Sequence, residues 1–225
     1  MPSSEKSFVI IPAFNEEKQI EFVVEAAQQA DPSLVNTDFI TVIDNNSTDN
    51  TAIRALAAGA RVISCERQGK GWAMEVGARH AGYLGATALT FLDADLIGLT
   101  GEHVTQLTKP VVEGPALMAI GYLGGRKPFA KKVLERWGGF SGQRTVSMEV
   151  WNRLDLSDLK NWRIEGALNA IMRNRGEGSL IERIELQGLR HIGKREKASN
   201  LANATVRYAQ TYGSAIRGLL SNSGK

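Results

Sequence analysis

The chain has 225 residues, of which 43% are hydrophobic and 23% charged, an ordinary globular composition with enough length for a sizeable core. No apolar run reaches the ~18 to 20 residues of a membrane-spanning helix, and residues 1–12 lack the pattern of a secretion signal, so we expect a cytoplasmic protein. The net charge of +3 demands no nucleic-acid partner, and the single cysteine, Cys65, excludes an intrachain disulfide and a cysteine-based zinc site.

The first part of the chain alternates between strand and helix patterns. A short apolar run predicts a buried strand over residues 8–11, and apolar residues at helical spacing predict a crossover helix over 16–30. A second strand follows at 40–43. An Ala-rich stretch after a helix-start cluster predicts a helix over 50–58, and a further strand follows at 61–64.

The alternation continues through a glycine-flanked turn. Gly69-Lys70-Gly71 opens a predicted helix that ends near Tyr83, and the apolar run 88–92 returns to the sheet. Alternation of this kind predicts an α/β fold with a mostly parallel central sheet, helices on both faces and ligands at the carboxyl ends of the strands.

The second part carries a weaker strand signal. Strands are predicted only at 116–122 and 180–186, between stretches with helical patterns. The predicted helices cover 127–137, 161–175 and 200–220. We therefore expect one domain over residues 1–225 with an elaborated, largely helical C-terminal part.

Polar turns follow three of the predicted strands. They are Pro12-Ala13-Phe14-Asn15-Glu16, Asp44-Asn45-Asn46-Ser47-Thr48-Asp49 and Asp93-Ala94-Asp95. Neighbouring parallel strands bring such turns to one edge of the sheet. An Asp-x-Asp pair alone is typical of a solvated loop, but directly after a buried strand and beside two polar turns it favours a site for Mg²⁺ or Mn²⁺ with a diphosphate.

These motifs, in this order, resemble those of family 2 and related GT-A glycosyltransferases. The resemblance covers roughly residues 7–125. It rests on the Val9–Glu17 run, the Asp44–Thr51 turn, the Gly69-Lys70-Gly71 turn and the Asp93-Ala94-Asp95-Leu96 segment. It includes polyprenyl-phosphate sugar synthases and glucosyl-3-phosphoglycerate synthases. It implies a Rossmann-like GT-A sheet and a nucleotide-diphosphate-sugar donor, with about 1–125 binding that donor and about 126–225 binding the acceptor.

The resemblance implies a set of donor-binding residues. They are Pro12, Ala13, Glu16, Asp44, Lys70 and Asp93. Glu16 is suited to accept hydrogen bonds from ribose hydroxyls, and Asp44 would face the base, although an aspartate there can also stabilise its own turn. Lys70 would place a positive charge near the diphosphate, the alternative being a solvated turn lysine.

The metal and acceptor sites are also implied by resemblance. Asp95 would bind the cation directly, and His191 would complete the site with a nitrogen ligand that Mn²⁺ accepts. Gly142, Arg144 and Thr145 would form a loop that binds the acceptor's phosphate through backbone donors, a guanidinium and a hydroxyl. The alternative for this loop is an ordinary glycine-bearing turn with an exposed arginine.

Glycosyl transfer would need charge stabilisation at the leaving diphosphate, which Asp95, through its cation, and Lys70 would supply. Glu165 is the candidate base by resemblance, but it could instead orient a sugar hydroxyl or begin a helix. It lies in Arg163-Ile164-Glu165-Gly166 and not in the acidic pair of many inverting relatives, which leaves retention or inversion open.

The sequence thus predicts a metal-dependent hexosyltransferase that uses a UDP- or GDP-sugar and a phosphate-bearing acceptor, either polyprenyl phosphate or a small glycerate-like phosphate. Basic and apolar residues in 127–137 would allow peripheral contact with the inner membrane surface, and an apolar stripe in 200–220 would allow a homodimer. The alternatives are a nucleotide-sugar-binding module without turnover and a sugar nucleotidyltransferase, although the latter normally has a Gly-rich basic loop after its first strand.

Overall fold

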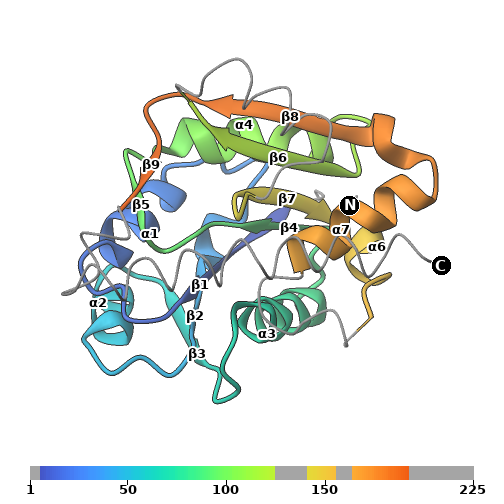
Figure 1. The fold of residues 1–225 in the computed structure, drawn as a ribbon. Coiled ribbons are helices and arrows are strands. Elements are labelled where there is room, and N and C mark those ends of the chain that lie inside the picture. Colours follow the sequence, from blue (N-terminus) through green and yellow to red (C-terminus); the bar gives the residue numbers. More distant parts are fainter. Residues whose placement is uncertain (1–5, 125–140, 156–163, 193–225) are drawn as a thin grey trace, which may run out of the picture.

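A seven-stranded sheet forms the centre of the fold, with strand order β3-β2-β1-β4-β7-β6-β8 (Figure 1). The structure is a computed structural model, and it describes residues 6–124, 141–155 and 164–192. The strands of this sheet are β1 (Ser7–Ala13), β2 (Thr41–Asp44), β3 (Arg61–Ser64), β4 (Ala88–Phe91), β6 (Met118–Leu123), β7 (Arg144–Ser147) and β8 (Ile181–Leu186). A separate two-stranded ribbon pairs β5 (Leu96–Ile97) with β9 (Arg190–His191).

The predicted mostly parallel sheet is confirmed. β1 pairs in parallel with β2 and β4, and β6 pairs in parallel with β8. The exception is β7, which runs antiparallel to both of its neighbours, β4 and β6. The predicted loop conformation is therefore wrong for Arg144 and Thr145, which lie in this strand. Its sequence, Arg-Thr-Val-Ser, has one apolar residue and thus lacks the apolar run by which the other strands are predicted.

Helices cover both faces of the sheet. One apolar core lies between the sheet and α1 (Ile20–Gln28), α2 (Thr51–Ala57) and α4 (Gly101–Val112). The other lies against α3 (Lys70–Tyr83), α6 (Met148–Trp151) and α7 (Ile164–Asn174), which are grouped beside the sheet in Figure 1. Alternate residues of β1 point to the two cores, Val9 and Ile11 to the first and Phe8 and Ile10 to the second, as the strand period requires. Two short 3₁₀ helices, η1 (Thr37–Phe39) and η4 (Glu177–Leu180), lie in connections.

Two predicted helices begin or end differently in the structure. The helix expected over 16–30 is α1 and begins at Ile20, because the backbone before it bonds to the neighbouring turn: Glu16 N–H donates to Thr51 Oγ1 at 2.8 Å and Glu17 N–H to Asp49 Oδ2 at 3.2 Å. Of the helix expected over 161–175, the described part is α7. The helices expected over 127–137 and 200–220 lie outside the described residues, so membrane contact, the dimer and the single-domain organisation stay predictions.

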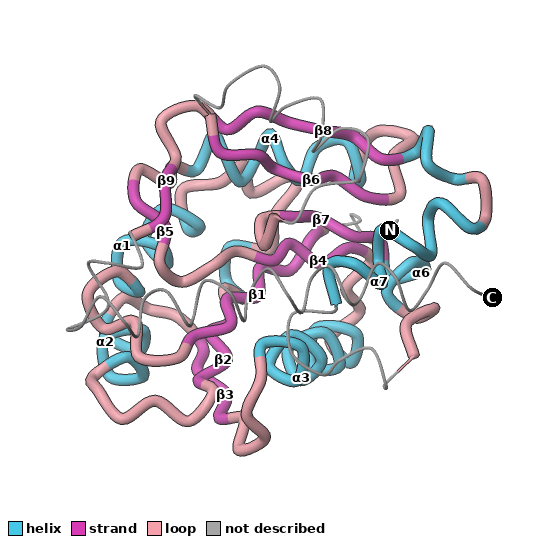
Figure 2. Tube along the Cα trace, viewed as in Figure 1, coloured by secondary structure: helices cyan, strands magenta, loops and turns pink. Residues whose placement is uncertain are grey.

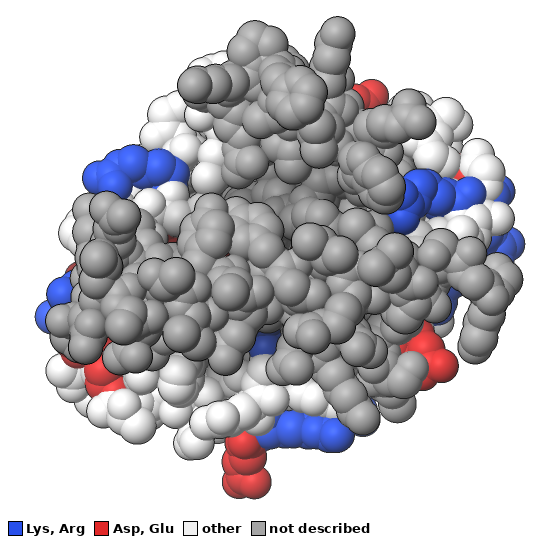
Figure 3. Space-filling model, viewed as in Figure 1, with Lys and Arg blue, Asp and Glu red and all other residues white. Residues whose placement is uncertain are grey.

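Among the described residues, no helix is both long enough and apolar enough to cross a bilayer. On the face seen in Figure 3, basic and acidic side chains of the described residues lie in small separate groups. The loops after β1 and β2 lie side by side at one end of the sheet (Figure 2). This end is where the predicted site residues come together.

Candidate active site

The carboxyl ends of β1 and β2 are in register, with Ala13 opposite Asp44 and Asn45 N–H donating to Ala13 O at 2.8 Å. Asp93 lies two residues after the end of the next parallel strand, β4, and Lys70 is the first residue of α3. The sheet therefore brings together residues that are up to 80 positions apart in the sequence, as the predicted topology requires.

Lys70 is the shared cation of a buried carboxylate, Glu165, and a partly buried one, Asp93. Its Nζ donates to Asp93 Oδ1 at 2.7 Å and to Glu165 Oε1 at 2.8 Å. The Glu165 side chain is only 6% exposed, and its Oε2 has no hydrogen-bond partner among the described residues. A desolvated carboxylate oxygen without a partner is costly, so this atom is suited to accept a hydrogen bond from a ligand.

Asp95 and His191 lie beside this ion pair. The β5–β9 ribbon places Leu96 opposite His191, which brings the imidazole Nδ1 to 2.9 Å from Asp95 Oδ1. Donation from Nδ1 to Asp95 directs the Nε2 lone pair to the other side of the ring, where Asp93 Oδ2 lies 3.8 Å away. Asp93, Asp95 and His191 each offer one ligand atom, and these atoms lie within 4.8 Å of one another. Carboxylate oxygens with one imidazole fit Mn²⁺ or Mg²⁺.

The charges of Lys70 and Asp93 favour each other's ionised form. Burial would lower the pKa of Lys70, but the carboxylates of Asp93 and Glu165 outweigh burial and raise its pKa above the ordinary value. Burial would raise the pKa of Asp93, and the charges of Lys70 and His191 lower it below the ordinary value. Burial would also lower the pKa of His191, whereas the hydrogen bond to Asp95 and the charge of Asp93 raise it. Lys70 is thus an ammonium at neutral pH and cannot serve as a base.

Side-chain hydrogen bonds join the two turns that carry the predicted nucleoside-binding residues. Asn15 N–H donates to Ser47 Oγ at 3.0 Å, and Asn15 Oδ1 accepts from Thr48 N–H at 2.8 Å. The Glu17 carboxylate accepts from the backbone and side chain of Asn50, both at 3.1 Å. Asn15 has a φ of 56°, a left-handed conformation that asparagine tolerates better than most residues. The polar motif residues therefore hold the two turns as one platform.

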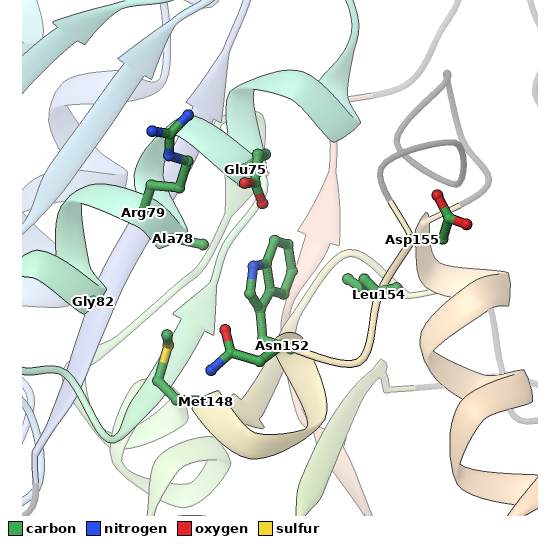
Figure 4. Close-up of a pocket in the computed structure, with 9 residues that line it drawn as sticks. Glu75, Ala78, Arg79, Gly82, Met148, Asn152, Leu154 and Asp155 are labelled. Carbon is green, nitrogen blue, oxygen red and sulfur yellow. The ribbon is translucent and has the colours of Figure 1, made fainter.

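A hollow between α3 and α6 lies elsewhere in the fold. Its cavity volume is about 450 Å³, and it contains none of the predicted site residues. Figure 4 shows Glu75 and Arg79 of α3 on one side of the hollow, Met148 of α6 and the next residue after that helix, Asn152, on another, and Asp155 at the side. The chemistry-bearing residues thus converge at the carboxyl edge of the sheet and not in this hollow.

Comparison with known proteins agrees with this geometry. The family model for "Glycosyl transferase family 2" matches residues 8–174, which is more than half of the chain. The chain belongs to glycosyl transferase family 2. The match includes every predicted site residue except His191.

Curated relatives are similar over about half of the chain. Glucosyl-3-phosphoglycerate synthase of Mycobacterium tuberculosis is 36% identical over 120 residues, which are 50% of this chain and 36% of the relative. The enzyme of the same name from Mycolicibacterium smegmatis is 38% identical over 112 residues, or 46% of this chain and 35% of the relative. The matched part thus spans about a third of the length of these curated relatives.

Solved structures of glucosyl-3-phosphoglycerate synthase are also similar to this chain. The M. tuberculosis glucosyl-3-phosphoglycerate synthase in complex with Mn²⁺, UDP-glucose and phosphoglyceric acid has a TM-score of 0.78 and 26% identity, over 99% of this chain and 80% of that one. Its complex with Mg²⁺ and UDP gives the same values. The predicted GT-A fold is therefore confirmed.

The structure corrects the predicted positions of two acceptor residues. The Arg144 and Thr145 side chains are fully buried, so neither forms part of an open phosphate-binding loop. The Arg144 guanidinium donates to Ser141 O at 2.7 Å and to Glu165 O at 3.4 Å, and Thr145 Oγ1 bonds to Thr90 Oγ1 at 2.8 Å. Arg144 therefore links the approach to β7 with the start of α7.

Two further residues support the site and were missed in the sequence. Gln143 donates from Nε2 to Asp93 Oδ2 at 2.7 Å. Asn45 Oδ1 accepts from Gly69 N–H at 2.7 Å, while its Nδ2 donates to the carbonyls of Cys65 at 3.0 Å and Arg67 at 2.8 Å. Both residues occur inside motifs that resemble the family, and this place in a motif was the only indication in the sequence of a role at the site. Their partners are 24 and 50 residues away, where sequence spacing gives no indication.

Asn45→Asp should therefore loosen the turn that precedes Lys70. The substitution keeps the size of the side chain but places a carboxylate oxygen against two carbonyls, losing two buried donor bonds. We expect the free energy of unfolding to fall by about 2 to 6 kcal/mol, at about 1 to 3 kcal/mol for each of the two unsatisfied carbonyls. Urea unfolding measures this loss. Asn36→Asp, directly before η1, is the control, and equal stability of the two variants would contradict the role of Asn45.

Proposed function

We propose that this protein is a metal-dependent glycosyltransferase that moves a hexose from a UDP-sugar to a small phosphate-bearing acceptor. One observation carries the proposal: the Asp93–Asp95–His191 cluster lies directly beside the Lys70–Glu165 ion pair, at the carboxyl edge of the sheet. A cation-binding cluster and a fixed ammonium at that edge provide what the departure of a diphosphate requires.

The donor would bind across the two joined turns. Pro12 and Ala13 end β1 beside Asp44, and Glu16 follows on the same turn. The carboxylates of Glu16 and Asp44 would accept hydrogen bonds from the ribose and the base. The similar M. tuberculosis structures hold UDP or UDP-glucose, which favours a uridine nucleotide over a guanosine nucleotide.

Asp95 and His191, with Asp93, would hold the divalent cation. When bound, Mg²⁺ or Mn²⁺ would stabilise the negative charge that develops on the leaving diphosphate. Lys70 would add a permanent positive charge on the same side without taking part in proton transfer. Its ion pairs with Asp93 and Glu165 fix the ammonium before the donor binds, so little reorganisation remains for the reaction.

Glu165 would contact the sugar or the attacking hydroxyl through Oε2. Its other oxygen is held by Lys70, and the backbone carbonyl of Glu165 is held by Arg144, so the carboxylate has a fixed position. From that position it can orient a hydroxyl or accept its proton. Whether transfer retains or inverts the anomeric configuration depends on which of these it does.

The acceptor would be a small glycerate-like phosphate. Several similar M. tuberculosis structures hold phosphoglyceric acid, which favours this class over polyprenyl phosphate. Gly142 lies at the site against Asp93, and Arg144 and Thr145 begin β7, where both side chains are buried. The acceptor-binding role predicted for these three residues stays a prediction.

Titration calorimetry of UDP and GDP, each with and without Mn²⁺, tests the cation-dependent donor site. We expect UDP to bind at least about tenfold more tightly with Mn²⁺, and Asp95→Asn to remove that gain. Asp38→Asn, an exposed acid on η1, should behave as the wild type. UDP binding that Mn²⁺ does not affect would contradict the proposal.

Release of UDP from UDP-glucose in the presence of 3-phosphoglycerate tests turnover. We expect product only when cation, donor and acceptor are all present, and no product from Asp95→Asn. Tight cation-dependent binding of UDP-glucose without any transfer would overturn the enzymatic proposal and favour a nucleotide-sugar-binding module.

A further inference from the structure

The segment before β7 encloses the carboxylate of Asp93. Gln143 is fully buried and donates from Nε2 to Asp93 Oδ2 at 2.7 Å. Gly142 lies so close that a Cβ there would be 2.3 Å from both Asp93 carboxylate oxygens. Residues of this short segment therefore contact an aspartate that is 50 positions earlier in the chain.

Ser141 determines which way the Gln143 amide points. Ser141 Oγ donates to Gln143 Oε1 at 2.8 Å, and Gln143 N–H donates to the same hydroxyl at 3.3 Å. An amide whose oxygen accepts from a serine must present its NH₂ group on the other side, which here faces Asp93. The three residues thus form a directed chain of hydrogen bonds from Ser141 through Gln143 to Asp93.

Asp93 is consequently held at both oxygens. Lys70 donates to Oδ1 and Gln143 donates to Oδ2, each at 2.7 Å, so the carboxylate cannot rotate without losing a charge-assisted hydrogen bond. Oδ2 is also the oxygen that lies 3.8 Å from His191 Nε2, on the side of the cation cluster. The bond from Gln143 therefore acts on the atom that faces the proposed cation.

A neutral donor is suited to this position. A lysine or arginine would add positive charge beside the cluster and compete with a divalent cation, and a carboxylate would repel Asp93. An amide fixes the direction of Oδ2 and leaves the negative charge of the cluster unchanged. The remaining lone pair of Asp93 Oδ2 can still coordinate a cation.

We propose that Gln143, oriented by Ser141, is a positioning residue that fixes Asp93 and so sets the affinity of the site for its divalent cation. The inference rests on the proposed function, since it assigns a determinant of the same cation site. A purely structural amide would contribute to the stability of the fold but not to cation affinity, and the two roles can be separated by experiment.

The test compares Gln143→Met and Ser141→Ala with the wild type by calorimetric titration of Mn²⁺ into the UDP-saturated protein. Gln143→Met keeps the size of the side chain and removes the donor. We expect it to weaken Mn²⁺ binding about 10- to 100-fold, as loss of outer-shell support does at other metal sites, and to leave metal-free UDP binding unchanged. Steady-state kinetics should show a raised KM for Mn²⁺ with a smaller change in kcat.

Ser141→Ala should weaken Mn²⁺ binding in the same direction, because the amide loses its orientation. The double variant should be no weaker than Gln143→Met alone, since Ser141 acts through Gln143. Thr108→Val is the control: it removes another buried hydroxyl, bonded to Thr90 at 3.1 Å, and should lower the Tm without affecting Mn²⁺ binding. If Gln143→Met does not fold, the Mn²⁺ affinity of Ser141→Ala alone decides the test.

Wild-type Mn²⁺ affinity in both Gln143→Met and Ser141→Ala would overturn the inference and leave the proposed function intact. A fully additive double variant would overturn the part that has Ser141 act through Gln143. Absence of cation-dependent UDP binding in the wild type would instead overturn the proposed function, and the inference with it.

Discussion

Lys70→Met should lower kcat for sugar transfer at least about 100-fold, the usual cost of removing one preorganised charge donor from a transition state. Lys70 contacts both Asp93 and Glu165 and is the cation that the two carboxylates share. Methionine preserves the length and volume of the side chain, so the expected loss comes from the charge. Measurement of kcat at saturating donor and Mn²⁺ tests the expectation.

The same substitution should also destabilise the protein. Removal of one partner from a buried ion pair leaves an uncompensated charge and costs about 3 to 5 kcal/mol. A second variant separates this loss from the catalytic one: Lys70→Met combined with Glu165→Gln removes one of the two orphaned charges. We expect the double variant to recover part of the stability and none of the activity.

Lys109→Met provides the matched control for loss of a lysine. Lys109 pairs with Glu113 at 3.9 Å on the exposed side of α4, and both side chains are more than half exposed. Such pairs contribute little to stability, so this variant should resemble the wild type in kcat and in unfolding. A Lys70→Met enzyme with a kcat near that of the wild type would show that the ammonium is not needed at the diphosphate.

The elements that could be predicted are those whose sequence carries its own signal. β1, β2 and β4 have continuous apolar runs because both faces of a parallel strand are buried, and each ends in a polar turn. The turn before α3 is marked by glycines, and Gly69 has a φ of 129°, which side-chain-bearing residues rarely adopt. Because these strands are neighbours, their order alone placed Asp44, Lys70 and Asp93 at one edge.

The elements that could not be predicted depend on distant partners. β5 and β9 have two residues each and exist only as a pair, yet they bring His191 to Asp95. Arginine is usually an exposed residue, and the burial of Arg144 depends on carbonyls supplied by Ser141 and Glu165. Gln143 is an ordinary polar residue until its contact with Asp93 is known. Tertiary hydrogen bonds, which leave no local period in the sequence, decide all three placements.

The second large effect is expected from the smallest substitution in the site. Gly142→Ala would add a Cβ 2.3 Å from both carboxylate oxygens of Asp93, far inside contact distance. A flexible side chain could move aside, but this carboxylate is held by Lys70 at one oxygen and by Gln143 at the other. Either Asp93 or the segment that carries Gln143 must shift, and each shift disturbs the cation cluster.

We therefore expect Gly142→Ala to lower kcat/KM at least about 100-fold, in line with the sensitivity of catalytic geometry to displacements near 1 Å. The loss of stability should be moderate, about 1 to 3 kcal/mol for an overpacked site. Gly178→Ala is the matched control, because a Cβ at Gly178 would meet no atom within 4 Å. Steady-state kinetics with Mn²⁺ titration measures the effect. The KM for Mn²⁺ should rise in Gly142→Ala and stay unchanged in Gly178→Ala. If both alanine variants retained wild-type kinetics, Asp93 would be free to move without cost, and the close packing around it would not serve the reaction.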